Sequence, residues 1–144
     1  MSKVIRKILT TVISASVICS MAVAANAANG SETKRFSGVK LGNYVMSGEL
    51  TGCLTGGYAT TTCNKKVYYI AVNVTGYVMG ENAHGVIERQ DLGQAPRDRH
   101  NETSVYTFIG GHEPIGVETG SFWSSHEIRD GVNGVGHYLA TIDV

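Results

Sequence analysis

The stretch from Cys53 to Val78 constrains the fold of this chain more than any other part, because it contains a clear strand pattern. From Tyr68 onward, alternate positions hold Tyr68, Ile70, Val72 and Val74, and the positions between them are mixed in polarity. Side chains of a strand alternate between its two faces, so the pattern predicts a central strand whose Tyr68 set faces the core. The β-branched and aromatic content also favours a sheet over a helix.

The same stretch contains Cys53 and Cys63, which flank Gly56 and Gly57. Glycine adopts positive φ readily, as hairpin turns require, so a turn at the glycine pair would place the two cysteines opposite each other. We therefore expect a disulfide, which would stabilise the fold by roughly 2–3 kcal/mol. Two buried free thiols are the alternative, because sequence does not reveal whether the Cβ atoms approach closely enough.

Residues 1–27 have the pattern of a Sec signal peptide. The basic residues Lys3, Arg6 and Lys7 precede an apolar run, which ends in the small-residue motif Ala-Asn-Ala. Cleavage after Ala27 would release a secreted protein, either extracellular or associated with the cell envelope. No later apolar run is long enough for a membrane span in the mature form.

A lipoprotein is the alternative for this N-terminal segment, because Cys19 could accept a lipid. It is not favoured, since Ile18 stands where a lipobox has a small residue. The 12 basic and 12 acidic residues balance, so removing the three basic residues of 1–27 would leave a net charge near −3. A mildly acidic chain without a basic cluster is a poor candidate for binding nucleic acid.

The remaining chain reads as a single domain. Residues 28–43 are polar and glycine-rich, so we expect a flexible lead-in, followed by one domain over 44–144. Besides the central strand, the pattern predicts strands at 44–54, 84–92, 103–109, 121–129 and 135–144. The polar segment 94–101 is expected to be a loop, because Pro96 cannot donate a hydrogen bond to a sheet. Six or seven short strands indicate an all-β antiparallel sandwich or barrel, and we favour the single sandwich.

Motifs for chemistry are few. The five histidines stand at no recognised zinc spacing and no H-E-x-x-H occurs, so we expect neither a metal site nor a cofactor. Ser121, Ser124 and Ser125 lie near His126, but no G-x-S-x-G motif is present and sequence adjacency does not make a triad. No catalytic residue is assigned, and a small secreted hydrolase is kept as an alternative.

Exposed aromatic residues offer another route to function. We expect Trp123, Tyr69 and Tyr77 to contribute to an interaction surface, although a single tryptophan is also commonly a core or rim anchor. The expected function is a non-catalytic extracellular or cell-envelope interaction module, whose partner is an envelope component or a protein.

The layout also resembles small secreted β-sandwich proteins of Gram-positive bacteria, the lactococcin-type bacteriocins included. The resemblance rests on the segments VYYIAVNVTGY, TSVYTF, SFWSSHEIRDGVNG and HYLATIDV. It implies export, a β-sandwich and, as an alternative function, antimicrobial activity; it assigns no catalytic residue. The chain is longer and more acidic than these peptides, and it contains cysteines that they generally lack.

Overall fold

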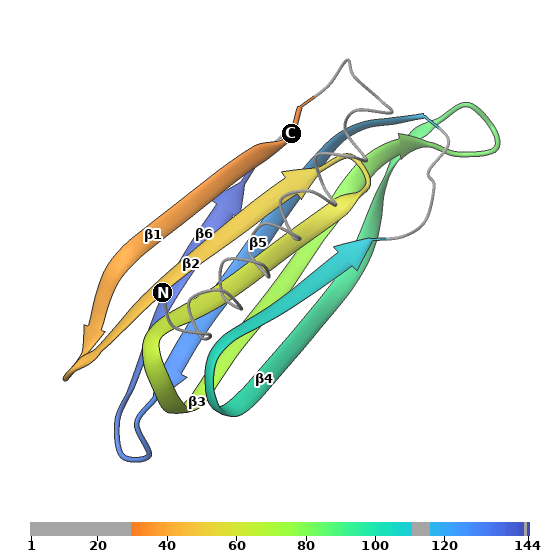
Figure 1. Ribbon diagram of the computed structural model, residues 1–144. Helices are drawn as coiled ribbons and strands as arrows, with labels where there is room; N and C mark the ends of the chain where they lie inside the picture. The colour runs from red at the N-terminus through yellow and green to blue at the C-terminus, as the bar shows by residue number, and fades with distance from the viewer. Residues whose placement is uncertain (1–29, 111–115, 143) are drawn as a thin grey trace.

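The computed structural model describes residues 30–110, 116–142 and 144, and within them the protein is built from strands (Figure 1). No helix occurs in this part of the chain. The strands are β1 (Glu32–Leu41), β2 (Tyr44–Cys53), β3 (Gly56–Glu81), β4 (Ile87–Gly110), β5 (Val117–Arg129) and β6 (Gly134–Thr141). The predicted all-β class, antiparallel pairing and number of strands are therefore confirmed.

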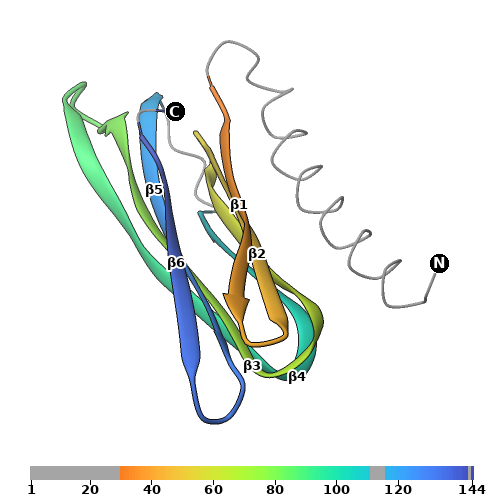
Figure 2. The same cartoon turned by 90° about the vertical axis from the view of Figure 1, so that its left-hand side faces the viewer.

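All six strands belong to one antiparallel sheet in the order β1-β2-β3-β5-β6, with β4 also paired to β3. The first part of β3, Gly56–Cys63, pairs with β2, whereas residues 69–80 pair with β5. Strand β4 follows β3 along both parts. Because β3 and β4 bend together, the sheet curls back on itself and β1 and β2 lie across from β5 and β6 (Figure 2).

The bend coincides with a break in the regular ladder between β3 and β4. The register shifts between Thr62 and Val67, and Asn101 on the facing strand has a φ of 54°. Asparagine tolerates this left-handed conformation better than most residues. Val67 and Ile70 are both buried at a separation of three, so the two-residue period is interrupted there.

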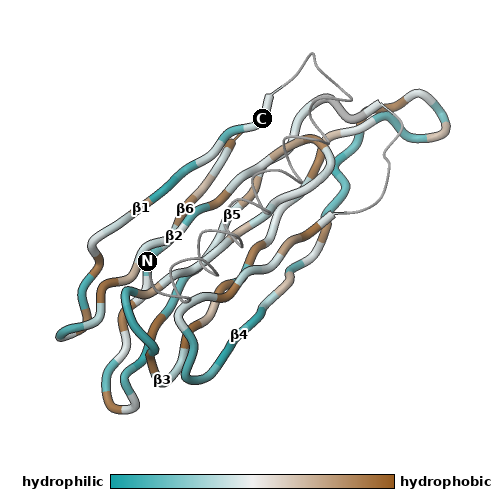
Figure 3. The backbone as a smooth tube through the Cα atoms, in the orientation of Figure 1, coloured by the Kyte–Doolittle hydropathy of each residue, from teal (hydrophilic) through white to brown (hydrophobic). Residues whose placement is uncertain are grey.

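Because of this interruption, the predicted core of β3 is wrong at Tyr68. Ile70, Val72 and Val74 face the interior as expected, but the Tyr68 side chain is 54% exposed. Strict alternation applies only to a regular ladder, and Tyr68 lies in the bend opposite Asn101. Figure 3 shows the alternation of apolar and polar positions along the strands.

The core fills the space between the two halves of the curled sheet. Its fully buried side chains come from both halves, including Met46 and Leu50 of β2 and Phe122 and Ile128 of β5. The Phe122 ring fits against four glycines, where an added Cβ would lie 2.4–2.8 Å from the nearest ring atom: Gly52, Gly57, Gly76 and Gly120. Since real Cβ atoms do not approach so closely, glycine is required there for the two halves to meet around this ring.

Two segments expected to be irregular are strands. Residues 28–43, predicted as a flexible lead-in, contain β1, because β2 supplies the hydrogen-bonding partners that the local sequence does not reveal. The predicted loop 94–101 lies inside β4, with Pro96 opposite Asn73. Proline is compatible with this position because β4 pairs on one side only, so a missing N–H need not break the ladder.

The predicted disulfide is wrong. Cys53 and Cys63 are not joined in the described structure, and both are buried. The turn lies at residues 54–55, so Cys53 faces Gly56, whereas Cys63 faces Met46 at the other end of the hairpin. At about 3.3 Å per residue, the two cysteines are roughly 23 Å apart along the strand. The Cys53 thiol instead donates a hydrogen bond to the Gly56 carbonyl at 3.2 Å.

The predicted signal peptide, residues 1–27, lies outside the described residues. The described residues form no helix with the length and apolar character of a membrane span.

Candidate functional site

The outer face of β3, β5 and β6 gathers aromatic side chains from distant parts of the sequence. Tyr77 and Trp123, two of the predicted surface residues, lie together with ring centroids 5.7 Å apart. They meet because Thr75 pairs with Trp123, which places Tyr77 diagonally beside it on the same face. The Arg89 guanidinium lies 4.0 Å from the centre of the Tyr77 ring. These three side chains form a cation–π and aromatic cluster at one end of the face.

Tyr69, the third predicted residue, belongs to a separate cluster. It lies eight residues before Tyr77 on the same face of β3, roughly 26 Å away at about 3.3 Å per residue. The Arg129 guanidinium lies 5.1 Å from its ring centre and the His100 ring lies at 5.4 Å. Burial, then Asp98 and Glu127, raise the pKa of Tyr69 against the opposing effect of Arg129. The hydroxyl therefore remains a hydrogen-bond donor at neutral pH.

Polar side chains and a further tyrosine lie between the two clusters. The register aligns Asn73, Ser125 and Tyr138 in one row across β3, β5 and β6. The Tyr138 side chain is 79% exposed. Sequence reasoning did not assign Tyr138 to a surface, although its alternation with Gly134 and Gly136 was a usable signal for an open face.

A hollow of about 680 Å³ opens beside Tyr138 on this face. Gly134 and Gly136 of β6 face Arg129 and Glu127 of β5, so the β6 side contributes no side chain at those two positions. The Glu127 carboxylate accepts a hydrogen bond from the Arg129 Nε within the hollow. We name the face defined by Tyr77, Trp123, Tyr138, Ser125 and Tyr69 the outer aromatic face.

The opposite face of β5 contains a buried hydrogen-bond chain around His126. The Thr61 hydroxyl donates to the Ala71 carbonyl at 2.9 Å, so it must accept from the His126 Nδ1, which lies 2.8 Å away. Nε2 is then unprotonated and accepts from the Ser124 hydroxyl at 2.7 Å. The chain joins the two halves of the curled sheet, because Thr61 and Ala71 lie on opposite sides of the bend in β3.

Aromatic rings enclose this histidine. The Phe36 ring of β1 meets His126 edge-on at 5.0 Å and lies 4.2 Å from the His137 ring. Burial, and to a smaller extent the charge of His137, lower the pKa of His126 to about 4. His126 is therefore neutral at physiological pH, in agreement with the tautomer that the hydrogen bonds require.

The geometry of Ser124 and His126 matches that of a nucleophile and its base, but the position does not suit catalysis. The two side chains are only 3% and 1% exposed, so a substrate cannot reach them. Thr61 occupies the third place, where a carboxylate would stabilise an imidazolium. Ser124 bonds the His126 ring, whereas Ser125, its neighbour in sequence, lies on the outer face. This hydrogen-bond chain therefore connects the two halves of the core.

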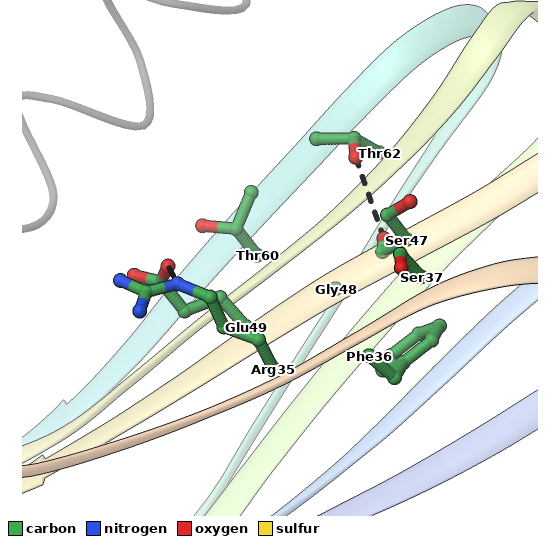
Figure 4. Close-up of a pocket in the computed structure, with 8 residues that line it drawn as sticks. All are labelled: Arg35, Phe36, Ser37, Ser47, Gly48, Glu49, Thr60 and Thr62. Carbon is green, nitrogen blue, oxygen red and sulfur yellow. Dashed lines mark hydrogen bonds and ion pairs between the residues drawn. The ribbon is translucent and has the colours of Figure 1, made fainter.

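A second hollow, of about 420 Å³, lies over β1, β2 and the first part of β3 (Figure 4). Its polar groups already bind one another: Arg35 forms an ion pair with Glu49, and the Thr62 hydroxyl donates to the Ser47 carbonyl at 3.4 Å. Phe36 points to the other side of the sheet. No histidine or cysteine is among the described residues that line this hollow.

Within residues 30–110, 116–142 and 144, no three histidine, cysteine, aspartate or glutamate side chains converge on a point that suits a metal ion. Comparison with protein-family models gives no match, and comparison with curated proteins finds no similar sequence.

Proposed function

We propose that this chain is a non-catalytic extracellular module of the β-sandwich type, which binds a cell-envelope component through its outer aromatic face. The observation that carries the proposal is the cluster of Tyr77, Trp123 and Arg89, with ring centroids 5.7 Å apart and the guanidinium 4.0 Å from the tyrosine ring. Tyrosine, tryptophan and arginine are the residues most enriched among the energetic anchors of binding surfaces.

The composition of the face favours a neutral glycan. A sugar ring presents C–H groups that stack on aromatic rings and hydroxyl groups that bond polar side chains. The outer aromatic face offers both, because Ser125 and Glu127 lie in the rows between the rings. A hollow of about 680 Å³ beside Tyr138 is large enough for one or two sugar units by comparison with ordinary ligand pockets.

The charges on the face support the same ligand class. Arg129 is paired with Glu127, and Arg89 is paired with Asp91 at 2.7 Å, so each cation lies beside an anion. A polyanion such as nucleic acid is bound by unpaired basic residues, which this arrangement does not favour. A neutral ligand does not need unpaired charges, so these ion pairs do not weaken its binding.

The test is retention of the purified chain on insoluble cell-wall material of Gram-positive bacteria, before and after protease treatment of that material. We expect retention that survives the protease and falls at least about tenfold in Trp123→Ala and Tyr77→Ala. Tyr44→Ala is the matched control, since Tyr44 also lies beneath a cation, Lys65 at 4.7 Å, but on another part of the sheet.

Three results would overturn the proposal: no retention, equal retention of Trp123→Ala and wild type, or retention lost after protease. The last result would identify a protein partner instead of a glycan. A growth-inhibition assay on the same strains is a separate readout for antimicrobial activity, because binding to the envelope need not kill the cell.

A further inference from the structure

Strand β4 is 24 residues long and has a neighbour on only one side. Its partner is β3 along the whole length, and the described residues contain no strand on its other edge. An unpaired edge exposes a row of N–H and C=O groups that another strand can bind. Natural proteins usually carry features that prevent another strand from pairing with such an edge. The two parts of β4 differ in these features.

The first part of β4, residues 87–102, has several protecting features. Pro96 interrupts the row of donors, and the register shift opposite Gly76 and Tyr77 distorts the ladder. Seven charged residues occupy this part: Glu88, Arg89, Asp91, Arg97, Asp98, Arg99 and Glu102. Figure 3 shows a hydrophilic stretch along β4. Proline, a bulge and charges are the devices that prevent edge-to-edge pairing.

The second part, Thr103–Ile109, has none of these features. Its sequence TSVYTFI contains no charge and no proline. Its pairing with β3 is regular from Ser104 to Gly110. The outward side chains Tyr106 and Phe108 are 41% and 63% exposed, whereas Val105 and Ile109 are buried. This segment is therefore a straight, uncharged and partly apolar edge, held in place by β3 on its other side.

We propose that the Thr103–Ile109 edge binds the same segment of a second copy of this chain, antiparallel, with a two-fold axis at Tyr106. Opposed residues of an antiparallel pair point to the same side of a sheet, so the axis must lie midway between two opposed copies of the same residue. Tyr106 is the central residue of the uncharged segment. The sheets of the two copies would then form one continuous sheet across the axis.

The register of this pairing is self-compatible. Val105 would lie opposite Thr107 of the second copy, and Ser104 opposite its Phe108. Glu102, the nearest charge, would lie opposite Gly110 of the second copy, so no like charges meet. The same pairing centred on Asp98 would place Arg97 opposite Arg99 of the second copy, which like-charge repulsion disfavours. Self-pairing is therefore favoured in the second part of β4, whereas Pro96 and the register shift also disfavour it in the first part.

A second copy fits this edge better than an unrelated strand for a reason of symmetry. A two-fold contact uses the same segment on both chains, so it pairs the Thr103–Ile109 segment of both copies at once. A third copy then finds no unpaired segment of this kind to bind, and the assembly stops at a dimer. The protected first part would limit the contact to the uncharged segment. The surface is separate from the outer aromatic face, so the inference does not depend on the proposed function.

The test measures the mass of the purified chain by light scattering and sedimentation over a range of concentrations. We expect wild type to shift from monomer to dimer. Tyr106→Lys and Tyr106→Glu should each weaken the dimer at least about tenfold, because each places like charges on the axis. An equal mixture of the two variants should recover it through opposite charges. Tyr138→Lys is the matched control on β6, and its dissociation constant for the dimer should equal that of wild type.

Wild-type protein that stays monomeric at every concentration would overturn the proposal. Dimer loss in Tyr138→Lys equal to that in Tyr106→Lys, or no recovery in the mixture of folded variants, would do so too. Hydrogen exchange of wild type does not depend on variant folding. Alternate amides of Thr103–Ile109 should gain protection as concentration rises, and unchanged protection there would also refute the pairing.

Discussion

The two faces of β5 place similar side chains in opposite environments. Ser124 and His126 on the inner face are almost wholly buried, whereas their neighbours Ser125 and Arg129 on the outer face reach solvent. The inner pair has the hydrogen-bond geometry of a catalytic serine and histidine. The outer residues have no such geometry, but they lie on the accessible face.

This difference shows that hydrogen-bond geometry and accessibility must be judged together. On the inner face, both ring nitrogens of His126 are satisfied by Thr61 and Ser124, so the network connects parts of the core. A fully satisfied buried network stabilises a fold and leaves little for a ligand to bind. Rings exposed on the outer face, such as Tyr138, are the groups that a partner can cover.

The largest expected effect is at the centre of the inner face. Phe122→Ala should lower the free energy of unfolding by about 3–5 kcal/mol, because the Phe122 ring is fully buried. The surrounding glycines have no side chains that could move into the cavity. Urea unfolding measures the loss. Val132→Ala, at a 91% exposed side chain before β6, is the control and should change stability by no more than about 0.5 kcal/mol.

The buried histidine makes stability depend on pH. His126 has a pKa of about 4 in the fold and 6.5 when exposed, so between these values the unfolded chain binds more protons than the folded chain. Stability should therefore fall as pH decreases, by about 2 kcal/mol between pH 7.5 and pH 5. Urea unfolding at the two pH values measures this change.

His126→Gln is the variant that isolates this effect. It should be less stable at pH 7.5 but should lose less stability on acidification than wild type, because other groups titrate equally in both proteins. An unchanged slope in His126→Gln would contradict the assignment of the pH dependence to the inner face.

The sequence predicted the local part of this picture. Alternation identified Ile70, Val72 and Val74 as core residues, and residue type identified Tyr77 and Trp123 as surface candidates. It did not predict that Tyr77 and Trp123 meet, because their contact depends on β5 pairing with β3 rather than with its predecessor β4. Strand order is a property of the whole chain and leaves no local pattern.

The errors have the same origin. The predicted disulfide required a turn at Gly56, but pairing with β2 and β4 makes that residue the first of β3. Its φ of 153° suits glycine, and the Ile109 carbonyl would lie 2.1 Å from any Cβ there. The glycine therefore marks a close approach of two strands, which a sequence pattern cannot distinguish from a turn. Burial of His126 was likewise invisible, since β1 supplies the covering ring.

A moderate loss of stability is expected at Trp123, on the outer face. Trp123→Ala should lower the free energy of unfolding by at least about 1 kcal/mol, because the aromatic pair of Trp123 and Tyr77 adds about that much to the burial of the half-buried ring. It should also weaken retention on cell-wall material. Urea unfolding and the retention assay measure the two effects on the same preparation. A loss as large as that of Phe122→Ala would mean that Trp123 belongs to the core, and the two faces would no longer differ.

The smallest change in stability is expected at Tyr138, where binding and folding separate most clearly. The ring is 79% exposed, so Tyr138→Ala should change the free energy of unfolding by no more than about 0.5 kcal/mol. The ring also borders the 680 Å³ hollow, so its removal should reduce retention on cell-wall material. Unfolding and retention measured together decide whether or not Tyr138 belongs to the binding face. Reduced retention at unchanged stability would assign Tyr138 to the binding face, whereas unchanged retention would confine that face to Tyr77 and Trp123.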